Sequence, residues 1–230
     1  KIIMKETKYK KALGALEEDK SYSTEEALEL ILKQPKRKFQ ETVDISVWLG
    51  IDPKKSEQNI RGSLTLPNSL GKEVKVAAFV DSDKADEAKK GGADFIGLDD
   101  LIEKYKDGNI DFDVAITTPD QMKNVSKLAK VLGPKGLMPS PKSGTVTENI
   151  DKAVKEIKHG QVRFKAEQEG IVQGTIANVS MKKAQLKENF DSFINELKRL
   201  KPASSKGIYF KSVFLSTTMG PGYRIDTSQF

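Results

Sequence analysis

The sequence contains no cysteine and a single histidine, His159. Without cysteine the chain has no disulfide, thiolate metal site or cysteine nucleophile, and one histidine supplies neither a histidine metal cluster nor a plausible Ser-His-Asp triad. No window approaches the ~20 consecutive apolar residues of a membrane-spanning helix, and residues 1–5 lack the apolar core of a signal peptide. These absences remove most metal, hydrolase and membrane functions, and they predict a soluble protein that is not secreted.

The two common nucleotide-binding motifs are also missing. No G-x-G-x-x-G occurs, which weakens a dehydrogenase interpretation. The loop Leu132 to Gly144 approaches the G-x-x-x-x-G-K-[ST] spacing between Gly136 and Ser143, but Pro141 stands where the second glycine belongs. Proline removes an amide donor and fixes φ where a phosphate cradle needs a donor and freedom, and the loop follows a predicted helix, not a strand. We therefore interpret it as a stiff, basic surface loop.

Positive charge is unevenly distributed along the chain. The 230 residues carry a net charge of +6, yet residues 67–159 hold 15 lysines and no arginine against 16 acidic residues, which leaves that segment at −1. The flanks together carry +7. This distribution favours two ends that form one anion-facing unit around a neutral middle. Ordinary solvated surface lysines are the alternative explanation.

The first flank opens with lysines and continues with a helix. Residues 1–11 contain five lysines and no apolar period, which indicates a basic arm that orders on a partner. The segment Ser23 to Glu26 is a capping box, and it predicts a helix that stops before Pro35. The cluster Lys36 to Lys38 follows.

Two strands are predicted next. Apolar residues alternate with polar ones from Thr42 to Leu49, which predicts a strand with one packed face and one wet face. Trp48 falls on the wet face and is interpreted as structural. The alternating positions between Ile60 and Leu66 predict a second strand, and we expect it to pair with the first in antiparallel fashion.

The middle of the chain has a different pattern. Nearly continuous apolar strands near residues 74–80, 94–96 and 113–117 alternate with helical segments, which include one predicted from Pro119 to Leu132. Strands that are apolar throughout and alternate with helices indicate a parallel sheet covered on both faces. We predict an inserted Rossmann-like, doubly wound, three-layer α/β domain at residues 67–159.

After His159 the first pattern returns. Residues 162–177 are predicted to form a hairpin around Gly170, and an amphipathic helix runs from about 186 to 200. A chain that is α+β, then doubly wound, then α+β again is most simply an insertion. Residues 1–66 and 160–230 are therefore predicted to form one discontinuous α+β domain.

The last predicted strand ends in an unusual polar stretch. Val213 and Leu215 give the period-two apolar face, and three hydroxyl residues, a methionine and Gly-Pro-Gly follow from Ser216 to Gly222. Glycine allows close approach of the main chain, and hydroxyls with free backbone amides suit sugar and phosphate oxygens. The stretch is thus a candidate RNA-facing platform, whereas the plainer interpretation is a strand that ends in a turn.

Several of these motifs together resemble one known family, the L-one proteins of the large ribosomal subunit. The resemblance runs from about Thr7 to Asp226. Its motifs are Leu132 to Pro139, Lys38 to Val43, Leu49 to Pro53, Asn59 to Gly62 and Thr217 to Pro221. It implies a discontinuous α+β domain, an inserted Rossmann-like domain and a hinge of two crossings. Gln40 departs from the family pattern, which has an acidic residue there.

The resemblance also implies a function. Members bind a folded rRNA stalk, whose movement accompanies deacylated tRNA leaving the exit site, and bacterial members repress their own operon by binding its mRNA. The expected partners are therefore stalk rRNA, exit-site tRNA, the protein's own mRNA and other ribosomal components, with no cofactor, metal, membrane or homo-oligomer. The expected location is the cytoplasmic ribosome, and a processed organellar form stays open because Lys1 is not an initiator methionine.

The RNA-facing residues that the resemblance and the polar stretch imply lie in both flanks. They are Lys38, Phe39, Thr42, Arg61, Arg163, Lys165, Ser212, Thr217, Thr218, Met219 and Gly220. Structured RNA is recognised largely by shape and by contacts to 2′-hydroxyls and phosphates, which these residue types can supply. For Phe39 and Met219 a place in the core is the competing interpretation.

Two other function classes compete with an RNA-binding role. An enzyme would use the doubly wound domain for a nucleotide or small molecule, but neither a phosphate loop nor a titratable cluster is evident. A receiver-like module would use Asp81, Asp83 and Asp113, which are more simply explained as loop caps. We therefore predict a ribosomal RNA-binding protein that is not an enzyme.

Overall fold

The computed structural model describes residues 20–35, 37–71, 74–106 and 108–230. Their contacts divide the chain into two compact units, one of Lys1–Leu70 with Phe164–Phe230 and one of Gly71–Arg163. Each change of unit lies four residues beyond the crossing expected from the sequence. The predicted basic arm at residues 1–11 lies outside the described residues.

A four-stranded antiparallel sheet organises the first unit, in the order β7-β1-β8-β9. Two helices, α2 and α8, accompany it, and a separate two-stranded sheet joins β2 to β6. The bounds are α2 Thr24–Lys33, β1 Thr42–Leu49, β2 Arg61–Thr65, β6 Gln161–Lys165, β7 Ile171–Asn178, α8 Lys183–Arg199, β8 Phe210–Thr217 and β9 Gly222–Ile225.

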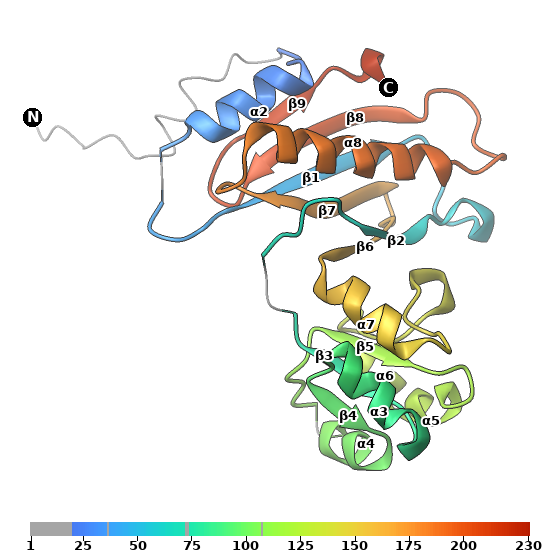
Figure 1. Ribbon diagram of the computed structural model, residues 1–230. Helices are drawn as coiled ribbons and strands as arrows, with labels where there is room; N and C mark the ends of the chain where they lie inside the picture. The colour runs from blue at the N-terminus through green and yellow to red at the C-terminus, as the bar shows by residue number, and fades with distance from the viewer. Residues whose placement is uncertain (1–19, 36, 72–73, 107) are drawn as a thin grey trace, which may run out of the picture. The chain divides into compact units, whose positions relative to one another are not determined.

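One face of the four-stranded sheet is packed and the other is open. Val43, Ile45, Val47 and Leu49 of β1 are buried in one core with the apolar stripes of α2 and α8. Figure 1 shows α8 lying across the strands with α2 beside it. The intervening residues of β1 are half-buried or exposed, as the period-two alternation predicts. The sheet therefore presents one face away from the helices.

Strand pairing differs from the two pairs predicted from the sequence. The strand β1 pairs with β7 and β8, not with β2. The expected hairpin of β6 and β7 is also wrong, because β6 pairs with β2 and only the bridge Ala166↔Val172 joins the two segments. At the bend Gly170 has φ +80, and an added Cβ would lie 3.1 Å from the Leu49 carbonyl oxygen. The bend therefore sends the two strands into different sheets.

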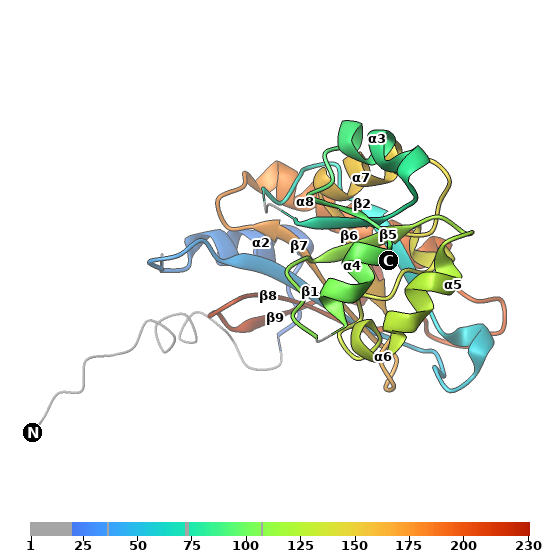
Figure 2. The same cartoon turned by 90° about the horizontal axis from the view of Figure 1, so that it is seen from below.

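The second unit is a three-layer α/β structure. Its parallel sheet has the order β4-β3-β5, with β3 Val76–Phe79, β4 Phe95–Gly97 and β5 Val114–Thr117. The helices α3 (Ser82–Gly91) and α7 (Ile150–Lys158) pack on one face, and α4 (Asp99–Tyr105) and α6 (Ala129–Leu132) pack on the other. Figure 2 shows both helical layers. All residues of β3 and β5 are buried, and the predicted fold class is confirmed.

The helix predicted from Pro119 to Leu132 is broken. It consists of α5 (Met122–Val125), a 3₁₀ turn at Ser126–Leu128, and α6. The Ser126 hydroxyl donates a hydrogen bond of 2.7 Å to the Met122 carbonyl, a local bond that competes with regular helix geometry. Within the residues that the structure describes, no helix combines the length and apolar character needed to cross a membrane.

Candidate nucleic-acid interface

The polar stretch after β8 meets the start of β1, and two threonines form the junction. Thr42 N–H donates to Thr218 Oγ1 at 3.1 Å, and Thr218 N–H donates to the Thr42 carbonyl at 3.2 Å. Their hydroxyl oxygens are 3.1 Å apart and share a further hydrogen bond. Thr218 is exposed and Thr42 is half-buried. Two residues 176 positions apart thus present neighbouring hydroxyls.

A carboxylate next to this junction orients the Thr42 side chain. The Thr42 hydroxyl lies 3.2 Å from Asp44 Oδ2, while Thr175 of β7 donates to Asp44 Oδ1 at 2.6 Å. Asp44 points to the open face because it follows Thr42 by two residues. Its two oxygens are therefore engaged by hydroxyls from adjacent strands, which fixes the position of both hydroxyl groups.

Backbone amides of the turn between β8 and β9 donate hydrogen bonds to acceptors within the protein. Met219 N–H donates to Glu41 Oε1 at 3.0 Å, and Gly220 N–H donates to the Thr217 carbonyl at 3.1 Å. The Met219 carbonyl accepts from Arg37 Nη2 at 3.2 Å. The expectation that this stretch offers free amides is therefore wrong for Thr218, Met219 and Gly220. What it offers instead are hydroxyls, an exposed thioether and the Arg37 cation.

Gly220 is required by close packing beneath the turn. A Cβ at Gly220 would overlap Thr217 Oγ1 and Gln34 Oε1 and would lie 2.9 Å from Gln34 Nε2. Thr217 is 3% exposed, and its hydroxyl donates to Gln34 Oε1 at 3.0 Å. Gln34 in turn donates to the Tyr223 hydroxyl at 3.2 Å. Thr217 thus faces inward and supports the turn, in contrast to the exposed Thr218.

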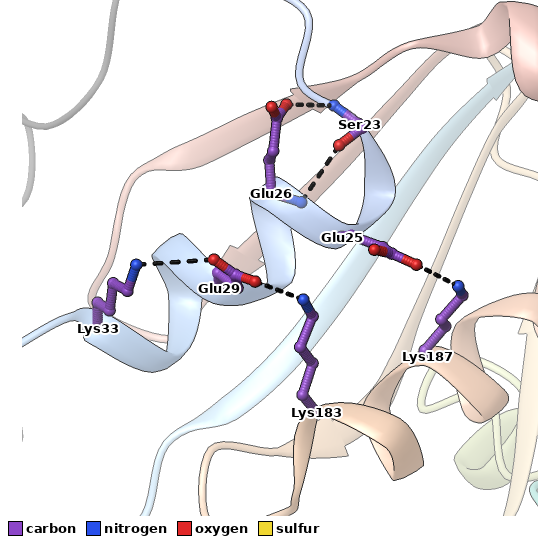
Figure 3. A network of polar contacts seen from close by, with 7 residues as sticks. All are labelled: Ser23, Glu25, Glu26, Glu29, Lys33, Lys183 and Lys187. Atoms are coloured by element: carbon purple, nitrogen blue, oxygen red, sulfur yellow. Dashed lines mark hydrogen bonds and ion pairs between the residues drawn. The ribbon is translucent and has the colours of Figure 1, made fainter.

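Helix α2 holds Gln34 in place because Gln34 is its C-terminal cap. The predicted capping box is confirmed by reciprocal hydrogen bonds between Ser23 and Glu26, 3.1 and 3.3 Å long. Figure 3 shows Lys183 and Lys187 of α8 reaching two glutamates of α2. Both pairs, Lys183–Glu29 and Lys187–Glu25, measure 2.5 Å.

These ion pairs change the titration of the α2 glutamates. The hydrogen bond from Lys187, followed by its charge, lowers the pKa of Glu25 below 4.5. Lys183 lowers the pKa of Glu29 in the same way. All four groups are solvent-exposed, so the pairs orient α2 on α8 more than they stabilise the unit.

The segment before β1 adds an exposed aromatic ring and positive charge. Phe39 and Met219 are each 53% exposed, and Lys38, which precedes Phe39 in sequence, is also exposed. The competing interpretation of Phe39 and Met219 as core residues is therefore wrong. Gln40, where the family has an acid, donates to Ser180 Oγ at 2.6 Å. Lys38, Phe39, Thr42, Thr218, Met219 and Gly220 accordingly belong to one region around the β1–β8 junction.

Ser212 lies at the other end of the same two strands. It is the partner of Trp48 in the β1–β8 register, on the open face. The register shifts there, with Leu49 opposite Phe210, so Lys211 has no partner in β1 and forms a β-bulge. Lys211 Nζ lies 4.6 Å from the Trp48 ring centroid. The structure therefore does not bring Ser212 to Thr42, but it places both on one face.

Arg61 and Lys165 form a second location on the paired strands β2 and β6. Both line an open pocket of about 700 Å³, together with Lys54 and Asn59. Arg61 Nε donates to Asn59 Oδ1 at 3.2 Å. Arg163 Nη2 donates a hydrogen bond of 3.2 Å to the Asp113 carbonyl. Burial lowers the pKa of the Arg163 guanidinium, and the charge of Asp113 opposes that shift. Arg163 is thus already engaged within its own unit.

Three supporting residues were missed at the level of sequence. Glu41 is 5% exposed yet carries a carboxylate, and it holds the Met219 amide. Gln34 and Arg37 precede β1 in the chain and contact the turn. Gln34 accepts a hydrogen bond from the Thr217 hydroxyl, and Arg37 donates one to the Met219 carbonyl. In the sequence, only the position of Glu41 within the Lys38 to Val43 motif and of Arg37 directly before it pointed to these roles.

The acids considered for a receiver-like role have structural partners. Asp81 accepts a hydrogen bond from Gln121 Nε2, and Asp113 Oδ2 accepts from Lys75 N–H at 3.1 Å. Among the described residues no group of three His, Cys, Asp or Glu side chains is arranged to hold a metal ion. These contacts give the inserted unit no arrangement that favours catalysis.

Comparison with known proteins decides the family. The model of the "Ribosomal protein L1p/L10e family" matches residues 31–221. The chain belongs to this family. It is 50% identical over 227 residues to the "Large ribosomal subunit protein uL1" of Cellvibrio japonicus, with 98% of each chain covered. It is 48% identical over 226 residues to the protein of that name from Coxiella burnetii strain Dugway 5J108-111, covering 98% and 97% of the two chains.

A third relative, the "Large ribosomal subunit protein uL1" of Maridesulfovibrio salexigens, is 49% identical over 219 residues, covering 95% of this chain and 93% of its own. The family recognised from the motifs is therefore confirmed. As a member of this ribosomal family the protein is a structural component of the large subunit and not an enzyme, and rRNA and other ribosomal components are its partners.

Proposed function

We propose that this protein binds the rRNA of the mobile stalk near the tRNA exit site through its first, discontinuous unit, residues 1–70 and 164–230. The hydrogen-bonded pair Thr42 and Thr218 carries the proposal, because it presents two oriented hydroxyls on an open sheet face. Hydroxyls held in this way suit 2′-hydroxyl and phosphate oxygens of folded RNA. Met219 and Phe39 flank them with exposed apolar surface that can pack on ribose or a base.

The predicted residues have three different roles in this proposal. Thr42, Thr218, Met219, Gly220, Lys38 and Phe39 form the central contact, and Ser212 extends it along β8. Lys165 and Arg61 supply phosphate contacts from the neighbouring pocket. Thr217 supports Gly220 from below, while Arg163 donates to the Asp113 carbonyl within the second unit and holds that part of the chain in place.

Two further activities follow from stalk binding in this proposal. Movement of the bound stalk accompanies release of deacylated tRNA from the exit site. The same surface binds an mRNA site that resembles the stalk, and by doing so it represses translation of the protein's own operon. A stalk fragment and the mRNA site then compete for one surface, so an excess of either RNA should displace the other.

The test is binding of the full chain to an isolated stalk fragment over a series of salt concentrations. Thr218→Val with Met219→Ala should weaken binding about tenfold or more and leave the salt slope unchanged, because no phosphate-neutralising charge is removed. Lys165→Ala should instead reduce that slope by about 1. Ser192→Ala, on the surface of α8, is the matched control and should bind normally. Equal binding to an unrelated hairpin would overturn the proposal.

A further inference from the structure

Exposed apolar side chains gather on one pair of strands. In the described part of the chain five large hydrophobic side chains are exposed, and all five lie in β1 or β8 or within three residues of these strands. Ile208, two residues before β8, lines a pocket with Lys198 and Phe230 instead. Phe39 and Met219 lie at the Thr42 end and belong to the proposed interface. Trp48 and Phe214, 45% and 39% exposed, lie beyond it. Aromatic rings on the wet face of a sheet are informative because strands normally place polar residues there.

The register places these two rings on the same face as Thr42. Trp48 follows Thr42 by six residues in β1, and side chains alternate with a period of two. Phe214 is opposite Ser46 in β1 and opposite Arg224 in β9. Trp48 and Phe214 are therefore diagonal neighbours across the β1–β8 pair. At a rise of ~3.3 Å per residue, Trp48 lies about 20 Å along the strand from Thr42.

Cations accompany both rings. Lys211 Nζ lies 4.6 Å from the Trp48 centroid, because the bulge turns this residue out of the ladder. Arg224 is exposed beside Phe214. Proteins that bind single-stranded nucleic acids combine aromatic rings with neighbouring cations, because the bases stack on the rings and the cations bind the phosphates.

The rest of this face favours RNA over a protein partner. The rings are surrounded mainly by polar side chains, namely Ser46, Ser212, Ser216 and Gln173, with Ile171 opposite Trp48 as an aliphatic neighbour. A hydrophobic protein interface would be expected to place several aliphatic side chains there. The acid on this face, Asp44, is held by the hydroxyls of Thr42 and Thr175. The surface is also continuous with the Thr42–Thr218 junction.

We propose that Trp48 and Phe214 form a stacking platform for unpaired RNA nucleotides that flank the folded RNA bound at Thr42 and Thr218. Lys211 and Arg224 contact the phosphates of these nucleotides, and Lys211 leaves the Trp48 ring when a base takes its place. The distance of about 20 Å equals the rise of about six stacked nucleotides, so a short flanking strand spans it. The choice of RNA as the ligand rests on the proposed function.

The single tryptophan of the chain makes the platform directly observable. Hexa-adenylate, titrated into the full chain, should quench the Trp48 fluorescence, whereas a hexamer of abasic ribose phosphate should not. Binding of dye-labelled hexa-adenylate, followed by anisotropy, should weaken about tenfold for Trp48→Leu and remain near normal for Trp48→Phe. Ile208→Ala is the control, because the exposed Ile208 side chain lines a pocket with Lys198 of α8 and Phe230 instead of the open face.

The outcomes separate this inference from the proposed function. Normal stalk binding without quenching by hexa-adenylate would overturn the platform alone, and quenching without stalk binding would overturn the stalk assignment alone. Equal quenching by the abasic hexamer, or unchanged hexa-adenylate binding by Trp48→Leu, would also overturn the platform. Sedimentation that shows a dimer lost in Trp48→Leu would mean that a second copy covers this face, and it too would overturn the inference.

Discussion

Replacement of Gly220 by alanine should damage the interface through packing alone. The added Cβ would overlap Thr217 Oγ1 and Gln34 Oε1. Gln34 cannot move aside freely, because it accepts from Thr217 and donates to the Tyr223 hydroxyl. Overpacking costs about 1–3 kcal/mol and loss of the Thr217–Gln34 hydrogen bond about 1 kcal/mol, so the unit should lose about 2–4 kcal/mol of unfolding free energy.

The effect can be measured in the affected unit itself. Trp48 is the only tryptophan and belongs to the unit that contains Gly220, so urea unfolding followed by its fluorescence reports that unit. At a denaturant slope of ~2 kcal/mol per molar, the midpoint should fall by about 1–2 M. Stalk affinity should fall as well, because the turn carries Thr218 and Met219.

A matched glycine nearby tests the steric reasoning. A Cβ at Gly222 would meet only the Phe214 ring at 3.9 Å, which is ordinary contact, so Gly222→Ala should change stability by less than about 0.5 kcal/mol. Adding Gln34→Ala to Gly220→Ala should restore part of the loss, since it removes one of the overlapping groups. A Gly220→Ala protein with the wild-type midpoint would refute the argument.

Three further predictions concern hydrogen bonds and titration. Glu41→Ala leaves the Met219 amide without its acceptor and should cost about 1–3 kcal/mol by urea unfolding, whereas Glu41→Gln keeps an acceptor and should cost less. The lowered pKa values of Glu25 and Glu29 mean that their contribution to stability is present above pH 4.5 and lost as pH falls below it. The melting temperatures of the wild type and of Glu25→Gln with Glu29→Gln should therefore converge in acid, and a constant difference would contradict this. Burial raises the pKa of Tyr209 to about 12, so its contribution is full below pH 10.0 and is lost as pH rises through about 12. Tyr209→Phe should remove this alkaline component, as monitored by circular dichroism from pH 9 upward in ~0.5 steps, and an unchanged alkaline transition would argue against it.

Local patterns in the sequence predicted much of the fold and part of the site. The alternation from Thr42 to Leu49 correctly assigned the packed and open faces of β1, and the capping box at Ser23 correctly marked the start of α2. Both signals arise from neighbouring residues, so they can be recognised without knowledge of the tertiary structure. The hydroxyl-rich stretch after Val213 was likewise recognisable from composition.

What could not be predicted depends on contacts between distant residues. Alternation shows that β1 has a packed face, but it does not say that β7 and β8 are its partners, and for this reason the pairing with β2 was predicted wrongly. In the sequence Glu41 resembles a surface carboxylate. Its burial could not be predicted, because the Met219 amide that donates to it is 178 residues away. The packing of Gly220 on Gln34 is equally invisible before folding.

The position of β1 between β7 and β8 has a consequence for biosynthesis. Both neighbours of this central strand are made more than a hundred residues later, after the whole inserted unit. At ~5–20 residues per second, the ribosome needs about 10–35 s to proceed from Thr42 to its partner Thr218. Until β7 has been made both edges of β1 are unpaired, and one edge stays unpaired until β8 follows; such edges are prone to aggregation. A nascent or prematurely terminated chain therefore lacks the proposed RNA-binding surface, and only chains extended through Thr218 can form the Thr42–Thr218 junction.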